Sequence, residues 1–527
     1  MRKYWLIVML AVVLGSNPLF IACSDDDDDN NNLTGDDDHT VTDDDLADDE
    51  AADDDVIDDD QADDDDLADD DTGGEEEDFY APPPTNDLGI FVSTTIGNDA
   101  NPGTMAAPVK TIAKGVQLAE AANKAVFVAE GVYPEGFSSN VSLFGGYRPS
   151  DWQRDPEAYL TSIQSPDGTQ VNLTGGSAQV PQILEGFSIA GGDAVAIGYY
   201  AYDESFAVEV SGEEAIIAHN RITGGQAIAS GFIAKAKTAG IRVYFAGSTL
   251  IRDNVVTANQ AFIITASEAY SYGILVYTES SVETRIEENH IGTMPTPGPH
   301  LFQGPANGVE IRGGMALLVG NEIEIGPSAA ENSIPLVVDD SGSVTAVNNL
   351  LVIKPNRNTA EAVVWAAGPA TLINNTLINQ TADIPWGIGI FSEVVLINNI
   401  FSLGPSNEAA MLFINDQGQH LISLIHNDLF CNADTLNLID AWFWTIDDLD
   451  ELNQCLWEGC REAAGNLIVN PGFISSADAH LAPTSPCIDA GVDPSPWYAG
   501  PEIHFDFDGE ARPQGAGWDI GFDEFVE

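Results

Sequence analysis

Ile217-Ala218-His219-Asn220-Arg221-Ile222 is the first full copy of a short pattern that recurs along the chain: apolar, any, any, Asn, any, apolar. The later copies carry their Asn at Asn254, Asn289, Asn321, Asn349, Asn375, Asn399 and Asn427. An earlier copy has Phe187 at that position, and successive steps from Phe187 to Asn427 are 24 to 35 residues long. A unit of this size cannot bury a core alone, so the pattern predicts a stack of repeating units.

A second pattern precedes the Asn of several units by 12 to 16 residues. It is Gly-Ile-x-Val or a close variant, and it begins at Gly240, Gly273, Gly308 and Gly387. Each unit therefore holds two or more short strands, which pair with the equivalent strands of the units above and below. We expect an all-β solenoid, a right-handed parallel β-helix that rises about 4.8 Å per coil. The alternative, a β-propeller, needs blades of about 40–50 residues.

The repeat also predicts where side chains point. We expect the Asn residues in left-handed turns, with their side chains hydrogen-bonded in a ladder along the stack. In the Gly-Ile-x-Val strands the two apolar residues point inward and the others point outward. Stacking then aligns Arg242, Leu275 and Glu310 in one outward column and Tyr244, Tyr277, Arg312 and Phe391 in the next, with Trp365 joining the second column in one of two possible registers.

An exposed column of aromatic and Arg side chains suits a glycan-binding surface, because sugars stack on rings and their hydroxyls accept Arg donors. The glycan-binding candidates are Arg242, Tyr244, Tyr277, Glu310, Arg312 and Trp365. The competing interpretation is that the long turns at residues 191–202 and 258–272 fold over this face. The binding hypothesis requires Tyr244 and Tyr277 to be solvent-accessible.

The chain is strongly acidic, with 84 Asp and Glu against 18 Lys and Arg in 527 residues and a formal charge of −66. Residues 24–78 hold 27 Asp and 4 Glu without a base, and the chain that follows still carries −37. This charge argues against nucleic acid or an anionic membrane surface as a partner. The Asp-rich stretch cannot bury a core, so we expect a disordered tether over residues 23–86; calcium buffering is the alternative.

The N-terminus has the features of an export signal. Arg2 and Lys3 precede an apolar run, Tyr4 to Leu14, that is shorter than the about 20 residues of a membrane-spanning helix. Leu19-Phe20-Ile21-Ala22-Cys23 then resembles the lipobox of bacterial lipoproteins, with Phe20 at the usual Leu position. The resemblance implies a signal peptide over residues 1–22, lipidation of Cys23, and anchoring to a membrane at the outer membrane or cell surface. A cleaved signal with an incidental Cys is the alternative.

Both ends of the remaining chain carry a family resemblance. Ile90-Phe91-Val92, the stretch from Gly97 to Thr104, an expected helix at about residues 111–122 and a strand at 126–133 resemble the start of bacterial right-handed β-helix surface proteins related to pectate lyases. In those proteins the helix caps the cylinder. Residues 485–491 and 506–513 resemble the C-terminal module of choice-of-anchor proteins. The resemblance implies fold and surface placement but no single activity, since such families include lyases, hydrolases and adhesins.

Residues that could catalyse a reaction are sparse. Asp339 and Asp340 are a carboxylate pair, which glycoside hydrolysis requires, but a surface turn explains them equally well. The Gly-His-Gly and Arg-Ile-Lys motifs of polygalacturonases are absent from the sequence. A pectate-type lyase would have to bring a polyanion to a body of charge −37, which calcium would have to bridge.

The cysteines and a late acidic loop offer further candidates. Cys431, Cys455, Cys460 and Cys487 predict two disulfides with three possible connectivities, in preference to a zinc site. Asp506-x-Asp508-Gly509 resembles the opening of a calcium loop without the Glu that an EF-hand needs, so a plain turn is favoured. No cofactor is expected, with calcium as the exception to consider.

These observations predict five segments: residues 1–22 as signal peptide, 23–86 as tether, 87–180 as N-terminal cap and first coils, 181–430 as β-helix repeats, and 431–527 as a C-terminal capping module with disulfides. The leading functional hypothesis is a non-catalytic envelope protein that has a structural role or binds polysaccharide or surface proteins. The alternative is a polysaccharide lyase or glycoside hydrolase acting at the cell surface.

Overall fold

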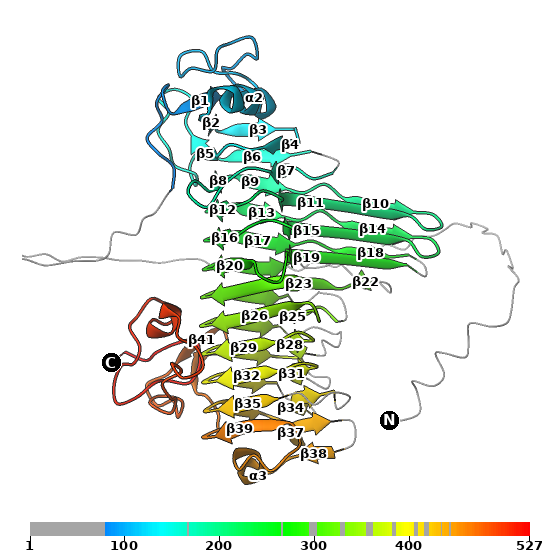
Figure 1. The fold of residues 1–527 in the computed structure, drawn as a ribbon, viewed down its shortest axis with the longest axis vertical. Helices are drawn as coiled ribbons and strands as arrows, with labels where there is room; N and C mark the ends of the chain where they lie inside the picture. Colours follow the sequence, from blue (N-terminus) through cyan, green and yellow to red (C-terminus); the bar gives the residue numbers. More distant parts are fainter. Residues whose placement is uncertain are drawn as a thin grey trace, which may run out of the picture. The chain divides into compact units, whose positions relative to one another are not determined.

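The structure is built from short parallel strands that stack coil upon coil, as the repeat predicts (Figure 1). The computed structural model describes residues 80–165, 168–264, 267–294, 303–326, 332–354, 362–381, 386–404, 409–415, 421–433, 435–441 and 444–526. All of them belong to one compact unit, Gly74–Glu527. The predicted signal peptide, Cys23 and the Asp-rich stretch to Asp78 lie outside the described residues.

Three long sheets form the walls of a right-handed parallel β-helix. Sheet 1 contains β1 (Gly89–Val92), β2 (Ala125–Ala129), β5 (Leu143–Tyr147), β8 (Gln182–Glu185), β12 (Ala215–Ala218), β16 (Thr249–Arg252), β20 (Glu283–Glu287), the second half of β23 (Ala306–Val319), β26 (Gly342–Val347), β29 (Ala370–Ile373), β32 (Val394–Ile397), β35 (Ile422–Ile425) and β39 (Cys460–Ala464). Sheet 2 contains β3 (Gly131–Tyr133), β6 (Thr161–Gln164), β9 (Ser188–Ala190), β13 (Arg221–Thr223), β17 (Val255–Ala258), β21 (His290–Thr293), β24 (Glu322–Ile325), β27 (Leu350–Ile353), β30 (Thr376–Asn379), β33 (Ile400–Leu403) and β36 (Asp428–Cys431).

Sheet 3 closes each coil and leads back to sheet 1. It contains β4 (Phe137–Ser139), β7 (Val171–Leu173), β11 (Tyr202–Val210), β15 (Lys235–Tyr244), β19 (Glu268–Tyr277), the first half of β23, β25 (Leu336–Val338), β28 (Ala362–Ala366), β31 (Trp386–Ile390), β34 (Ala409–Ile414), β37 (Leu436–Ala441) and the antiparallel β38 (Trp444–Ile446).

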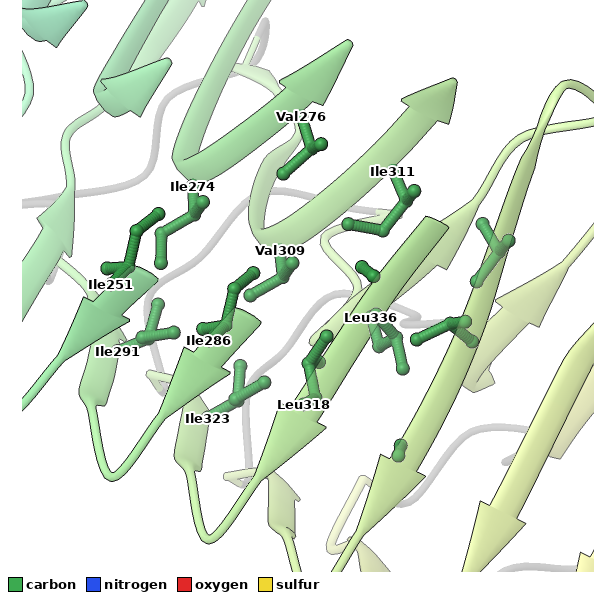
Figure 2. Packing of buried hydrophobic residues seen from close by; sticks show 14 of the residues in the cluster. Ile251, Ile274, Val276, Ile286, Ile291, Val309, Ile311, Leu318, Ile323 and Leu336 are labelled. Carbon is green, nitrogen blue, oxygen red and sulfur yellow. The ribbon is translucent and has the colours of Figure 1, made fainter. Parts of the chain in front are cut away.

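The core is a set of apolar columns inside the cylinder (Figure 2). Ile251, Ile286 and Leu318 stack from sheet 1, while Ile274 and Val309 stack from sheet 3, and all five are fully buried. Parallel pairing in register keeps each column continuous, because equivalent residues of successive coils face the same interior. The predicted inward direction of the apolar strand residues is therefore confirmed.

The predicted asparagine ladder is present at the turn between sheets 1 and 2. The Nδ2 of Asn254 donates to Oδ1 of Asn289 at 3.0 Å, and that same Oδ1 accepts the Asn254 backbone N–H at 3.0 Å. The pattern continues from Asn220 to Asn427 and extends to Asn466, which the repeat search missed. All of these side chains are buried, so the ladder satisfies polar groups that water does not reach.

One expectation about these turns is wrong. The left-handed residue is not the ladder Asn but the residue before it, such as His219, Asp253, Glu288 or Asn348. The ladder Asn must hold its amide in line with the next coil, so the change of direction falls on its neighbour. Glu rarely adopts this conformation, which means that at Glu288 the ladder overrides the local preference.

A fin extends from sheet 3 in three coils. It combines the first halves of β11, β15 and β19 with a fourth sheet of β10 (Ala194–Ile197), β14 (Ala227–Ser230), β18 (Ala261–Ile263) and the antiparallel β22 (Gln303–Gly304) (Figure 1). The two layers pack through alanines, among them Ala196, Ala229, Ala236 and Ala269. Small side chains allow the layers to approach closely, so the fin is thin. The turns at 191–202 and 258–272 thus form an added layer rather than a cover.

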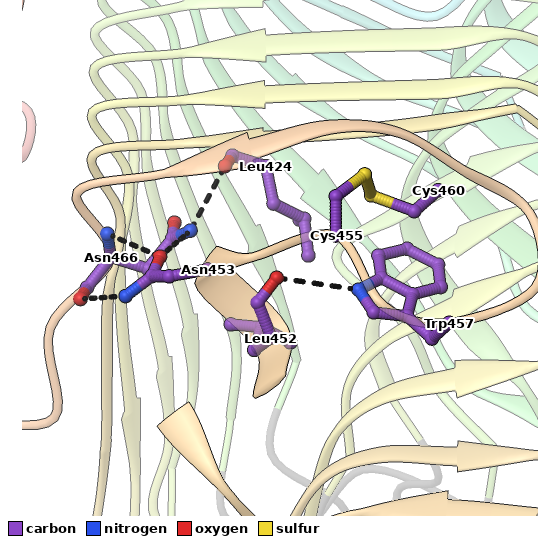
Figure 3. Close-up of a disulfide and its surroundings, with 7 residues drawn as sticks. All are labelled: Leu424, Leu452, Asn453, Cys455, Trp457, Cys460 and Asn466. Carbon is purple, nitrogen blue, oxygen red and sulfur yellow. Dashed lines mark hydrogen bonds between the residues drawn. A yellow bond between two sulfur atoms is a disulfide. The ribbon is translucent and has the colours of Figure 1, made fainter. Parts of the chain in front are cut away.

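Both ends of the cylinder are covered. Helix α2 (Ile112–Ala122), capped by the Thr111 side chain, buries Ile112, Val116 and Ala119 against the first coils, as expected. At the other end helix α3 (Leu449–Asn453) supplies Asn453, whose Oδ1 accepts from the backbone N–H and Nδ2 of Asn466 and terminates the ladder (Figure 3).

The last segment folds back along the β-helix. It contains the hairpin β40 (Phe473–Ser475) and β41 (Asp478–Leu481) and the 3₁₀ helix η1 (Pro501–His504). Asn348 and Asn398, both left-handed residues of the ladder turns, donate to the backbone carbonyls of Glu502 and Val492 at 3.0 and 2.7 Å. The turns that build the cylinder therefore also hold this module in place.

Candidate functional site

The candidate surface lies where the fin meets the outer face of sheet 3. β15, β19 and β23 bend here, and Gly240, Gly273 and Gly308 stand at the bends; Figure 2 shows the ribbons turning just before Ile274 and Val309. A Cβ at Gly308 would lie 2.4 Å from Ile323 Cγ2 and 2.6 Å from the Pro335 carbonyl oxygen. At Gly308, therefore, packing at the bend leaves no room for a side chain.

Arg242 connects the two sides of this bend. Its Nη1 lies 3.3 Å from Oε2 of Glu204, on the fin half of β11, and 3.5 Å from Oε1 of Glu209, on the body half. Its guanidinium also covers the rings of Phe206 and Tyr244, 4.4 and 3.9 Å from the ring centroids. Burial raises the pKa of Glu209, although Arg242 opposes this effect.

Arg312, in β23, is the centre of a second group of charged side chains. It pairs with Glu310, and its Nη2 donates to the Tyr272 hydroxyl at 2.7 Å. Burial disfavours the charge of Arg312, but Glu310, Tyr272 and Asp339 together outweigh that effect and the pKa of Arg312 lies above its usual value. Glu310 also accepts from Asn307 Nδ2 at 2.9 Å. Lys237 Nζ lies 3.5 Å from Glu204 Oε1, so three bases (Arg242, Arg312 and Lys237) face the three acids Glu204, Glu209 and Glu310 around the bend, in contrast to the acidic body.

An aromatic platform lies beside the Arg242 group. Tyr244 and Tyr277 are 37% and 39% exposed, and their rings stack with centroids 5.8 Å apart. Phe245 packs edge-on against both rings and is 54% exposed. The predicted accessibility of Tyr244 and Tyr277 is confirmed. We call Tyr244, Phe245 and Tyr277 the aromatic platform.

The assignment of Arg312 to the tyrosine column is wrong because the register shifts after Val276, and strand pairing decides between the two registers of Trp365. Tyr277 pairs with Gly313, so Arg312 is displaced from the tyrosine column at an irregularity of β23. Trp365 belongs to the other column, which runs from Arg242 through Leu275, Glu310 and Val337. Trp365 instead packs against Phe391, 4.4 Å between ring centroids, several coils away from the platform.

Sequence patterns missed Phe245, Glu204, Glu209 and Tyr272. Ala207 occupies the Gly position of the bend in β11, so a search for Gly-Ile-x-Val does not find the first coil of the surface. The strand register, in which Glu209 of β11 lies opposite Arg242 of β15, shows that β11 belongs to the surface. Phe245 and Glu204 lie beyond the pattern, and only the bend brings them close to it.

Asp339 and Asp340 form an exposed turn between β25 and β26. Gly342 N donates to the Asp339 carbonyl oxygen at 2.9 Å, and Asp340 N donates to Asp339 Oδ1 at 3.0 Å. Ser341 Oγ donates to Asp340 Oδ1 at 3.3 Å. Both carboxylates accept hydrogen bonds from within the turn, so a structural role in the turn accounts for Asp339 and Asp340.

The expectation of two disulfides is wrong. Cys455 and Cys460 are joined (Figure 3), whereas Cys431 and Cys487 are free thiols. Cys487 Sγ lies 3.6 Å from Asp428 Oδ2, and Cys431 Sγ lies 3.8 Å from the Gly404 carbonyl oxygen. Each thiol thus has an oxygen partner in place of a sulfur. Burial raises the pKa of Cys431 to about 11, which keeps this thiol protonated.

The acidic loop at Asp506 is largely satisfied by backbone donors. Asp506 Oδ1 accepts from the N–H groups of Asp508 and Glu510, and its Oδ2 accepts from that of Glu524. Asp508 lies 2.9 Å from Nε2 of His480. Asp506, Glu510 and Asp523 nevertheless bring one carboxylate oxygen each within 4.8 Å of one another, as do His480, Asp508 and Asp523 for their ligand atoms.

Comparisons with known proteins find a family model and solved structures that resemble this chain. A family model described as a protein of unknown function (DUF1565) matches residues 95–140. The crystal structure of pectate lyase Pel9A is similar with a TM-score of 0.43 and 11% identity, over 84% of this chain and 97% of that one. The GH136 lacto-N-biosidase from Eubacterium ramulus has a TM-score of 0.23 and 10% identity, over 72% of this chain and 68% of that one. No curated protein matches this chain in sequence.

Among the residues that the structure describes, no helix has the length and apolar character needed to cross a bilayer.

Proposed function

We propose that this chain is a lipid-anchored cell-envelope protein whose β-helix presents the aromatic platform for binding carbohydrate, without catalysing a reaction. Cys23 would carry the anchor at the outer membrane or cell surface, and the Asp-rich stretch would serve as the tether. The observation that carries the binding role is the exposed, mutually packed set Tyr244, Phe245 and Tyr277.

The platform has the chemistry that a sugar requires. Ring faces stack on the apolar face of a pyranose, and the tyrosine hydroxyls and nearby charged groups can hydrogen-bond its hydroxyls. Arg242 covers one face of Tyr244, so Phe245 and Tyr277 would supply the open ring surface. The balance of charge at the bend favours a neutral glycan over a polyanionic one. The choice-of-anchor resemblance supports surface placement, where polysaccharides and surface proteins are the available partners.

A glycan array probed with the full chain carrying Cys23→Ser tests this proposal. Phe245→Ala with Tyr277→Ala should weaken binding to the preferred glycan by about tenfold, because two stacking contacts are lost. Phe505→Ala is the matched control, since Phe505 is similarly exposed at 53% but lies in the C-terminal module. Equal binding by the platform variant and the control would contradict the proposal.

A carbohydrate-active enzyme is the second candidate, and one observation favours it. Glu204 and Glu209 both lie within 3.5 Å of the same Arg242 nitrogen, and burial raises the pKa of Glu209, as a general acid requires. A lyase or hydrolase at this site would release reducing sugar from the glycans that bind. Glu209→Gln should then abolish release while leaving binding intact, whereas a binding protein shows no release with either form.

The loop at Asp506 and Asp508 is a weak candidate for a calcium site, and calcium binding there can be tested. Because backbone donors already occupy Asp506, we expect at most a small effect of the ion on stability. Millimolar calcium should leave the thermal unfolding midpoint of the full chain unchanged relative to magnesium. A rise that Asp508→Asn removes would instead assign the loop as a structural calcium site.

A further inference from the structure

The distal end of the fin carries two turns of matching conformation, one coil apart, beyond the arrowheads of β10 and β14 (Figure 1). Gly198-Tyr199-Tyr200 and Gly231-Phe232-Ile233 adopt matching conformations, with φ of 132° and 139° at the glycines and 61° and 60° at the third residues. Gly198 N donates to the Ser230 carbonyl oxygen at 2.8 Å, and Tyr200 N to that of Phe232 at 3.1 Å. Backbone hydrogen bonds therefore stack the two turns on each other, as they stack the coils of the β-helix.

The conformation of these turns is costly for the residues that occupy them. Ile233 is β-branched and Tyr200 is bulky, and such residues seldom adopt a positive φ. Strain of this kind persists where the surrounding structure imposes it, and it concentrates at functional positions. Here it directs apolar side chains outward, since Tyr200 is 65% exposed.

The side chains at this end form an apolar surface that we call the fin tip. It consists of Ile197, Tyr199, Tyr200, Phe232, Ile233 and Ile264, all exposed. Tyr199 and Phe232 stack across the two turns with centroids 5.2 Å apart. Residues 194–202, 227–234 and 254–264 contain no Asp, Glu, Lys, Arg or His, although 19% of the chain is charged. The nearest charges, Asp203, Lys235 and Glu268, lie at the start of the long fin strands, and Lys235 Nζ pairs with Glu268 at 2.8 Å, so the turns themselves form an uncharged surface on an acidic body.

The side chains of the fin tip favour one kind of binding partner over the others. A sugar needs charged or amide groups beside the rings, which these three segments largely lack, and half of the tip side chains are aliphatic. A second copy of the chain would bring together two bodies of charge −37, which repel each other. A zwitterionic lipid surface carries no net charge to repel the body and accepts tyrosine and isoleucine side chains at its interface.

We propose that the fin tip inserts into the interfacial region of a zwitterionic lipid membrane. The fin then acts as a second, non-covalent membrane contact that does not depend on acylation of Cys23 or on glycan binding. The uncharged turns enter among the lipid headgroups, while the acidic body stays in water. The contact is driven by apolar burial, so it is insensitive to salt.

Flotation with phosphatidylcholine vesicles tests the inference, using the full chain with Cys23→Ser so that no acyl anchor contributes. The chain should float with the vesicles equally at 50 and 500 mM salt. Tyr199→Ser, Tyr200→Ser and Phe232→Ser together should lower the vesicle-bound fraction by about tenfold or more, because three apolar contacts are removed. These side chains are exposed, so folding is preserved, and circular dichroism verifies it.

The matched control combines Phe505→Ser and Leu456→Ser, two exposed apolar side chains outside the fin, and should float like the parent. Failure of the parent to bind vesicles, or equal binding by the fin-tip variant, overturns the inference. Concentration-dependent dimerisation that the fin-tip variant abolishes would assign the tip to a second copy instead. Loss of glycan binding in Phe245→Ala with Tyr277→Ala is a separate result, so failure of either proposal leaves the other to be judged by its own assay.

Discussion

A single side-chain type organises the turn between sheets 1 and 2. Each ladder Asn accepts the backbone N–H and the Nδ2 of the preceding ladder Asn through one Oδ1, and donates its own Nδ2 to backbone carbonyls and to the next amide. This geometry needs a carbonyl and an amide on a short stem, which Asn alone among the amino acids provides. Phe187 at the first position ends the ladder, because only its backbone N–H takes part.

Removing a rung should be costly. Asn321→Ala leaves the buried backbone N–H of Asn289 without its acceptor, so we expect a loss of about 1–3 kcal/mol in the free energy of unfolding. Urea denaturation measures the difference. Asn470→Ala is the control: its Oδ1 accepts from Gly472 N in an exposed loop, and it should change stability by less than about 0.5 kcal/mol. Similar losses in both variants would contradict the special role of the ladder.

The sequence predicts the ladder but not the backbone beside it. Spacing alone reveals Asn220 to Asn427, because the same residue recurs at every coil. The sequence predicts the left-handed position one residue too late, since Asn is the residue that favours that conformation in isolation. In the coil with Glu288 before the ladder Asn, hydrogen bonds between coils outweigh local preference, and that balance is invisible in a single sequence.

At the scale of the strand, the bend between fin and body needs Gly308 because there is no room for a side chain, not because the backbone needs the conformational freedom of glycine. Gly308→Ala places a Cβ against Ile323 Cγ2 and the Pro335 carbonyl, and we expect a loss of about 1–3 kcal/mol. Gly292→Ala, in neighbouring β21, meets nothing within 4 Å and should be neutral or slightly stabilising. Thermal unfolding of the two variants gives the comparison, and an equal effect would show that the bend tolerates a side chain.

The same bend explains which part of the candidate site could be predicted. The outward direction of Tyr244 and Tyr277 follows from alternation along the strand, and the structure agrees. The ion pair of Arg242 with Glu204 requires the fin half of β11 to turn back toward the body, which alternation cannot reveal. Arg312 was misplaced for a related reason, because the irregularity after Val276 moves it out of register.

At the scale of the whole molecule, the β-helix and the C-terminal module share a buried titratable contact. Asp428 lies in β36, and its Oδ2 accepts from Cys487 of the module. Burial raises the pKa of Asp428 to about 7, whereas an unfolded Asp titrates near about 3.9. The folded chain therefore keeps a proton that the unfolded chain releases, and stability falls as pH rises from about 4 to about 7.

Asp428→Asn should remove this pH dependence. Between pH 5 and pH 8 the parent should lose more stability than the variant, by at most about 3 kcal/mol, because only the two pH units between 5 and the folded pKa of about 7 contribute. Burial also raises the pKa of Asp253 to about 6 and that of Glu524 to about 7, but these groups act equally in both chains and cancel in the difference. Urea midpoints across the pH range provide the measurement, and parallel profiles would refute the assignment.

Because the asparagine ladder repeats once per coil, one full coil is the smallest segment that can be inserted or deleted without breaking the ladder. A stretch running from one ladder position to the next can be duplicated or excised while every remaining amide still finds an equivalent neighbour. A coil added or removed between Asn348 and Asn398 would displace one of the two turns that hold the C-terminal module, so changes of a single coil are compatible with the module only outside that span.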